Sequence, residues 1–140
     1  MKLQSCLRIL FLSALLAGLM WGGALVQRVS AASLVVDSLV DAAVADDGAC
    51  TFREALINAN NDNQSGSTDC AAGSGADTIT FSLSGTVGLY TFLPNVTDVD
   101  GLTVDGSGQT MTISGSSVWW VFYLGNGARL DLLNLTVANG

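Results

Sequence analysis

Short β-prone triplets, separated by turn residues, fill the sequence from residue 77 to residue 140. The triplets are Ile79-Thr80-Phe81, Leu102-Thr103-Val104, Met111-Thr112-Ile113, Leu130-Asp131-Leu132 and Leu135-Thr136-Val137. Each one alternates apolar and polar side chains, which is the pattern of a strand with one buried face. Ile79 and Leu102 are 23 residues apart, and Met111 and Leu135 are 24 apart. This loose period predicts an all-β solenoid of parallel strands with few coils.

A β-sandwich is the alternative fold. Its strands would recur every eight to twelve residues and would be joined in antiparallel hairpins by two-residue turns. The turns between these triplets are mostly longer, and the triplets resemble one another. The sequence therefore favours the solenoid over the sandwich.

One helix is predicted ahead of the triplets, over residues 51–60. Thr51 and Glu54 have the spacing of a capping box, in which each side chain accepts a hydrogen bond from the other residue's backbone N–H. An apolar stripe with helical spacing follows at Phe52, Ala55, Leu56 and Ala59. We expect this amphipathic helix to cover the exposed apolar end of the first coil.

A Gly-rich polar loop, residues 61–76, follows the helix and contains Cys70. Cys50 precedes the helix, so these two cysteines bracket the helix and most of the loop. In an exported chain such a pair predicts a disulfide, which would stabilise the fold by roughly 3 kcal/mol. Two free buried thiols, or a metal site, are the alternatives.

The amino-terminal residues have the three parts of a secretory signal peptide. Lys2 and Arg8 come first, Ile9 to Val26 is a run of eighteen uncharged residues, and Val29 and Ala31 occupy the small-residue positions of a cleavage site. We expect residues 1–31 to be a cleaved signal peptide. The protein is then secreted or displayed at the cell surface. A retained membrane anchor at residues 9–26 is the alternative.

The mature domain would be strongly acidic. Residues 32–140 contain two arginines and all twelve acids, so their formal charge is 2 − 12 = −10, with no Lys and no His. This charge excludes nucleic acids and anionic membranes as partners. The composition also excludes chemistry that depends on a histidine base or a lysine nucleophile.

Residues 50–60 resemble a known motif. Cys50-Thr51-Phe52-Arg53-Glu54-Ala55, followed by Ile57, Ala59 and Asn60, is similar to the CSLREA string of exported bacterial proteins. The strings 75–81, 102–106 and 134–140 also resemble that family, so the likeness covers about residues 34–140. It implies a right-handed parallel β-helix on a secreted or surface protein, without implying a reaction. Relatives usually have more coils, and we expect this chain to be truncated at its carboxyl end.

Three acids are the candidates for a catalytic or calcium site, namely Asp98, Asp100 and Asp105. A glycoside hydrolase needs carboxylates around a common groove, and Arg129 with Asp131 would lie about one coil further on. Calcium needs six to eight oxygens, and no segment matches a known calcium loop. Solvated turn acids are the simpler interpretation, so we expect no catalytic residues, no cofactor and no metal.

Two further features have a structural and a functional interpretation. Arg53 neighbours the capping Glu54, and we interpret it as a charged residue on an exposed helix face. Trp119 to Tyr123 is the densest aromatic cluster. If it is a strand, Trp119, Val121 and Tyr123 share one face, and Trp120 and Phe122 share the other. One face would pack in the core, and the other could stack on a sugar or a protein.

These observations predict a non-catalytic, exported β-helix module that acts as a scaffold for adhesion or recognition. Polysaccharides or surface proteins are the expected partners. An amino-terminal fragment of a polysaccharide lyase or hydrolase is the alternative. The strand at 135–137 should have a bare edge, which predicts self-association through the carboxyl end.

Overall fold

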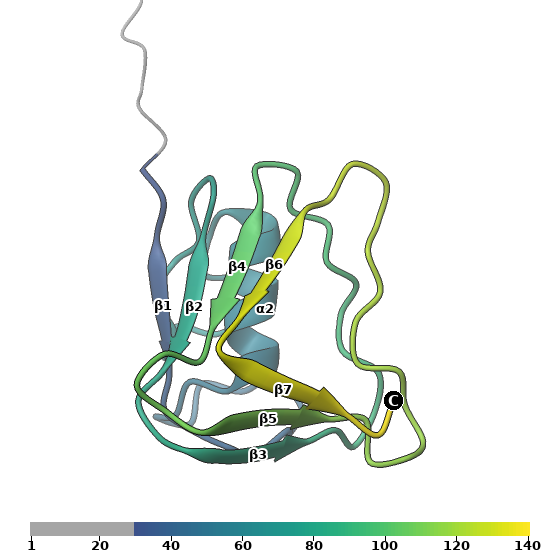
Figure 1. Cartoon of the computed structure of the whole chain (residues 1–140). Helices are drawn as coiled ribbons and strands as arrows, with labels where there is room; N and C mark the ends of the chain where they lie inside the picture. The colour runs from purple at the N-terminus through teal and green to yellow at the C-terminus, as the bar shows by residue number, and fades with distance from the viewer. Residues whose placement is uncertain (1–29) are drawn as a thin grey trace, which may run out of the picture.

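The computed structural model describes residues 30–140, so the predicted signal peptide lies almost entirely outside the described residues. One helix and seven short strands make up this part of the chain (Figure 1). In chain order they are β1 (Ser33–Val36), α2 (Phe52–Asn61), β2 (Thr78–Phe81), β3 (Gly85–Gly88), β4 (Leu102–Asp105), β5 (Met111–Ser114), β6 (Leu130–Leu133) and β7 (Leu135–Ala138).

The strands form two parallel sheets. One has four strands in the order β1-β2-β4-β6, and the other has three in the order β3-β5-β7. Figure 1 shows the larger sheet upright, the smaller sheet across the bottom of the view, and α2 behind the larger sheet. From β2 onward, successive strands belong alternately to the larger and the smaller sheet.

The predicted all-β, right-handed parallel β-helix is wrong, because the structure is an α/β arrangement of two small parallel sheets and one helix. Seven of the ten α2 residues are buried, and the apolar stripe of the helix belongs to the same core as the strands. The β-sandwich is wrong as well, since every strand pair is parallel. Alternating triplets identify strands with one buried face, but they do not specify how the sheets are arranged.

Inward-facing side chains of the larger sheet form a continuous ladder. The register aligns Leu34 with Ile79 and Ile79 with Val104, and none of the three is exposed. The structure aligns Met111 with Leu135, the pair that the sequence period matched, but it aligns Ile79 with Val104 instead of Leu102. A difference of two residues leaves the same side chains facing inward, because strand side chains alternate with a period of two.

Both halves of the predicted capping box are present at the start of α2. The Thr51 N–H donates to Glu54 Oε2 at 3.0 Å, and the Glu54 N–H donates to Thr51 Oγ1 at 3.3 Å. Glu54 Oε1 also accepts from the N–H of Ala45 at 2.9 Å. The capping carboxylate therefore holds the preceding segment as well as the helix. α2 ends at Asn61, and Asp62 follows with φ 50° in the left-handed region.

The loop after α2 wraps around Asn58, which is fully buried. The Asn58 side chain donates to the carbonyls of Ser67 and Ala71 and accepts from the N–H groups of Gly66 and Ser67. A side chain at Gly73 would collide with the backbone carbonyl of Asn58, so the close approach of the loop requires glycine there. A disulfide between Cys50 and Cys70 joins the two ends of this unit.

Candidate functional site

Four aromatic residues from two loops make up what we call the aromatic platform: Tyr90, Phe92, Trp119 and Trp120. The exposed fractions of Tyr90, Phe92 and Trp120 are 52%, 39% and 59%, and Trp119 is partly buried against the core. The Phe92 ring centroid lies 4.7 Å from that of Trp119 and 4.4 Å from that of Trp120. Aromatic pairs of this kind contribute about 0.5–1.5 kcal/mol beyond their buried area, so they stabilise this arrangement of rings.

The platform is built from two segments that are far apart in the sequence. Tyr90 and Phe92 lie between β3 and β4, and the two tryptophans lie between β5 and β6. These connections run side by side at the right of Figure 1, where Val96 and Leu124 form a parallel bridge. Of the four platform residues, only the two tryptophans belong to the aromatic cluster identified in the sequence, Trp119 to Tyr123, because no local pattern indicates that residues 90–92 lie nearby.

A buried ion pair supports the platform from below. The Arg53 guanidinium binds the Asp41 carboxylate through two hydrogen bonds of 2.7 and 2.8 Å, and the two side chains are only 8% and 1% exposed. Arg53 also donates to the carbonyls of Thr91 and Phe92, while Asp41 accepts from the N–H of Tyr90 at 3.0 Å. The Tyr90 ring lies over the guanidinium, with its centroid 5.2 Å from Arg53 Cζ. The interpretation of Arg53 as an exposed neighbour of the cap is therefore wrong.

Residues 119–123 do not form a strand. Trp119 follows a turn in which Ser116 and Ser117 have φ of 56° and 61°, and the Trp119 N–H donates to the Gly115 carbonyl at 2.8 Å. Val121 is buried, whereas Trp120 and Tyr123 are exposed. The side chains therefore do not alternate between two faces, because the turn sets their directions.

The three acids proposed for catalysis are not brought together. Asp98 and Asp100 precede β4, whereas Asp105 is its last residue. Asp98 Oδ1 accepts from the N–H groups of Asp100 and Gly101, and Asp105 Oδ1 accepts from Ser107 N and Asn134 Nδ2. The hydrogen bonds from Asn134 and Ser107 lower the pKa of Asp105. Asp98 and Asp105 thus serve as acceptors in turns at opposite ends of a strand.

Asp77 is a buried acid that the sequence analysis missed. Its carboxylate accepts from the N–H groups of Ala32 and Ser74, and its side chain is almost fully buried. Burial raises the pKa of Asp77, and the nearby charges of Asp98 and Asp62 raise it further. Asp98 is 5% exposed, and its Oδ2 has no hydrogen-bond partner within residues 30–140. In the same part of the chain, no group of three or more acidic, cysteine or histidine side chains has the geometry of a metal site.

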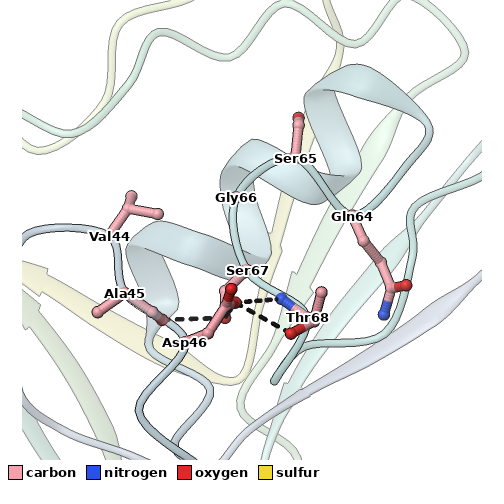
Figure 2. Close-up of a pocket in the computed structure, with 8 residues that line it drawn as sticks. All are labelled: Val44, Ala45, Asp46, Gln64, Ser65, Gly66, Ser67 and Thr68. Atoms are coloured by element: carbon pink, nitrogen blue, oxygen red, sulfur yellow. Dashed lines mark hydrogen bonds between the residues drawn. The ribbon is translucent and has the colours of Figure 1, made fainter.

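An open hollow of about 210 Å³ lies between residues 44–46 and 64–68 (Figure 2). Its floor contains Asp46, which accepts from Thr68 N, Thr68 Oγ1 and Ser67 Oγ at 2.7, 3.0 and 3.1 Å. The hydrogen bonds from Thr68 and Ser67 lower the pKa of Asp46. All three donors bind Oδ1, so this oxygen ties the two loops together.

Arg129 and Asp131, the other pair considered for catalysis, lie at the start of β6. Both are exposed, and neither side chain makes a hydrogen bond or an ion pair within residues 30–140. They flank Leu130, whose side chain packs against the core.

The part of the chain from residue 30 onward has no helix with the length and hydropathy to cross a membrane. Comparison of the chain with protein-family models, with curated proteins and with solved structures gave no match.

Proposed function

We propose that this protein is an exported, non-catalytic recognition module that binds polysaccharide on the aromatic platform. The observation that carries the proposal is a buried, bidentate ion pair that holds residues 90–92, the segment that carries two of the three exposed rings. Burying two charges costs free energy, because both lose their hydration, and their mutual attraction often does not offset that loss. Here the pair fixes the backbone of residues 90–92 and so presents Tyr90 and Phe92 in a defined orientation.

The chemistry of the platform suits a sugar ring. The face of an aromatic ring is electron-rich, and the C–H groups on one side of a pyranose ring carry small positive charges, so the two surfaces attract each other when they stack. A contiguous exposed apolar patch on a soluble protein often marks an interaction site.

The charge of the domain favours neutral polysaccharides over uronates. Residues 32–140 have a formal charge of 2 − 12 = −10. A surface of that sign repels anionic polymers. The one cation at the platform, Arg53, is already neutralised by Asp41.

Export is supported by the sequence and by the disulfide. Residues 1–31 have the pattern of a signal peptide, and a Cys50–Cys70 bond is typical of proteins that fold in an oxidising compartment. The resemblance of residues 50–60 to the motif of exported proteins points the same way. An enzymatic role has less support, because Asp98 and Asp105 lie at opposite ends of β4.

Binding to a panel of neutral and uronate polysaccharides, measured by affinity electrophoresis and calorimetry, tests the proposal. We expect Trp120→Ala to weaken binding to a neutral polymer about fivefold to tenfold, since one aromatic stacking contact contributes about 1 kcal/mol. Tyr123→Ala is the matched control, because Tyr123 is 57% exposed, against 59% for Trp120, but lies outside the platform.

Equal losses in the two variants, or no binding to any neutral polymer, would contradict the proposal. Release of reducing ends or of unsaturated products from the same polymers would establish the enzymatic alternative instead.

A further inference from the structure

The backbone of Ala32, just before β1, is held at both of its hydrogen-bonding groups. The Ala32 N–H donates to Asp77 Oδ1 at 2.8 Å, and the Ala32 carbonyl accepts from the N–H of Thr78 at 2.9 Å. The Ala32 side chain packs against the core, whereas Ser30 and Ala31 are exposed. The nitrogen of Ala32 therefore has a fixed position beside a buried carboxylate.

Asp77 belongs to a group of acids that no cation neutralises within residues 30–140. Burial raises the pKa of Asp77, and the charges of Asp98 and Asp62 are close enough to raise it further. Asp98 is 5% exposed, and its buried Oδ2 has no hydrogen-bond partner in this part of the chain. The only ion pair among these residues is the one between Arg53 and Asp41. Because a buried carboxylate is costly without a cation, the site has the chemistry of a receptor for a positive charge.

The carboxyl end of α2 makes the site still more negative. Asn60 lies in the last turn, and its Oδ1 accepts from the N–H groups of Thr97 and Asp98, so Asp98 lies beside the end of the helix. The unpaired carbonyls at this end of a helix carry a partial negative charge. The last turn of α2 contains no basic residue to offset that charge.

We propose that this site binds the α-ammonium group of Ala32, which removal of the signal peptide creates. The sequence pattern places the cleavage between Ala31 and Ala32. Hydrolysis of that peptide bond consumes one water molecule, leaves a carboxylate on Ala31 and converts the amide nitrogen of Ala32 into an ammonium group. The inference rests on the export that is part of the proposed function, and it does not depend on polysaccharide binding.

Cleavage turns an existing hydrogen bond into an ion pair. The nitrogen of Ala32 already lies 2.8 Å from Asp77 Oδ1, and the ammonium has two further N–H donors. Ser74 Oγ donates to the carbonyl of Ser30, so loss of Ser30 leaves this hydroxyl oxygen free to accept from the ammonium. A neighbouring cation favours the ionised form of Asp77, so its raised pKa belongs to the chain in which Ala31 is still attached. The domain thus reaches its full stability only after its signal peptide is removed.

Two chains that differ only at their amino end test the proposal, residues 32–140 and residues 31–140, each released by a protease that leaves no extra residue. Their net charges are equal, but the ammonium of the longer chain is one residue away from Asp77. We expect the unfolding equilibrium constant, measured by urea denaturation, to be about tenfold or more lower for residues 32–140. Asp77→Asn should reduce this difference to less than about twofold, because it removes the charge that the ammonium binds. Asp100→Asn is the matched control at an exposed acid and should leave the difference unchanged.

Acylation of the amine is a second measurement, because residues 32–140 contain no lysine and the α-amine is their only amine. An ammonium that is paired with a buried carboxylate is a poor nucleophile, so residues 32–140 should react about tenfold or more slowly than residues 31–140. If Asp77→Asn does not fold, the two parent chains decide through their unfolding constants and acylation rates.

Equal unfolding constants for the two parent chains, or equal acylation rates, would overturn the proposal. A mass of the exported protein that corresponds to cleavage at another bond would also overturn it, whereas the mass of residues 32–140 is expected. None of these results involves the aromatic platform, so a failure here is distinct from a failure to bind polysaccharide.

Discussion

Arg53 and Asp41 show how much a single buried pair can organise. Their two side chains connect the segment before α2, the helix itself and the backbone of residues 90–92. Arg53→Met would remove the bonds of the guanidinium and leave the buried Asp41 carboxylate with the Tyr90 N–H but without a cation. We expect this variant to lose about 3–5 kcal/mol of unfolding free energy, measured by urea denaturation.

The double variant R53M/D41L is the control, because it removes both charges together. It should lose less unfolding free energy than Arg53→Met alone, since no unpaired charge stays buried. A loss below about 1 kcal/mol for Arg53→Met would show that the pair contributes little to the fold.

At the scale of elements, α2 depends on the carboxylate of Glu54. This side chain accepts from the backbone N–H groups of both Thr51 and Ala45 and is 1% exposed. Glu54→Ala leaves the buried N–H of Thr51 and the part-buried N–H of Ala45 without their acceptor, so we expect a loss of about 1–3 kcal/mol in unfolding free energy. Glu54→Gln keeps one acceptor oxygen and should lose less, and equal losses in the two variants would contradict this account.

The sequence predicted most helices and strands correctly, but it did not predict which side chains are buried or which distant segments are in contact. The capping box and the strand triplets depend on neighbouring residues, so they could be recognised directly. β3 was missed, because Gly85-Thr86-Val87-Gly88 has a single large apolar residue and two glycines. The burial of Arg53 and the contact of Phe92 with Trp119 and Trp120 depend on segments far apart in the sequence, which no local pattern could indicate.

At the scale of the whole molecule, the stability contributions of the acids with shifted pKa values change with pH in opposite directions. Burial raises the pKa of Asp77, so the folded state binds that proton more tightly than the unfolded state. Its contribution to stability is therefore lost as pH rises from the ordinary aspartate value of 3.8 through the raised pKa. Hydrogen bonds lower the pKa of Asp46 and Asp105, so their contribution is lost as pH falls below that same value.

We therefore expect the unfolding free energy to have a maximum in mildly acidic solution. Urea denaturation of the chain that retains Ala31, between pH 3 and pH 7, measures it. In Asp77→Asn the decrease on the neutral side should become smaller, while the decrease on the acidic side stays. If the unfolding free energy of this variant decreases toward pH 7 as much as that of the parent, general repulsion among the other carboxylates causes the decrease, and Asp77 does not.

The position of the disulfide has a consequence for the lifetime of the molecule. Cys50 and Cys70 are 1% and 2% exposed, so a thiol in solution cannot approach either sulfur while the domain is folded. Reduction proceeds by direct attack of a thiolate on sulfur, and it must therefore wait for α2 and its loop to open. The rate of reduction is then set by the frequency of that opening. A folded copy that meets a reducing environment keeps its bond for as long as this one unit stays closed.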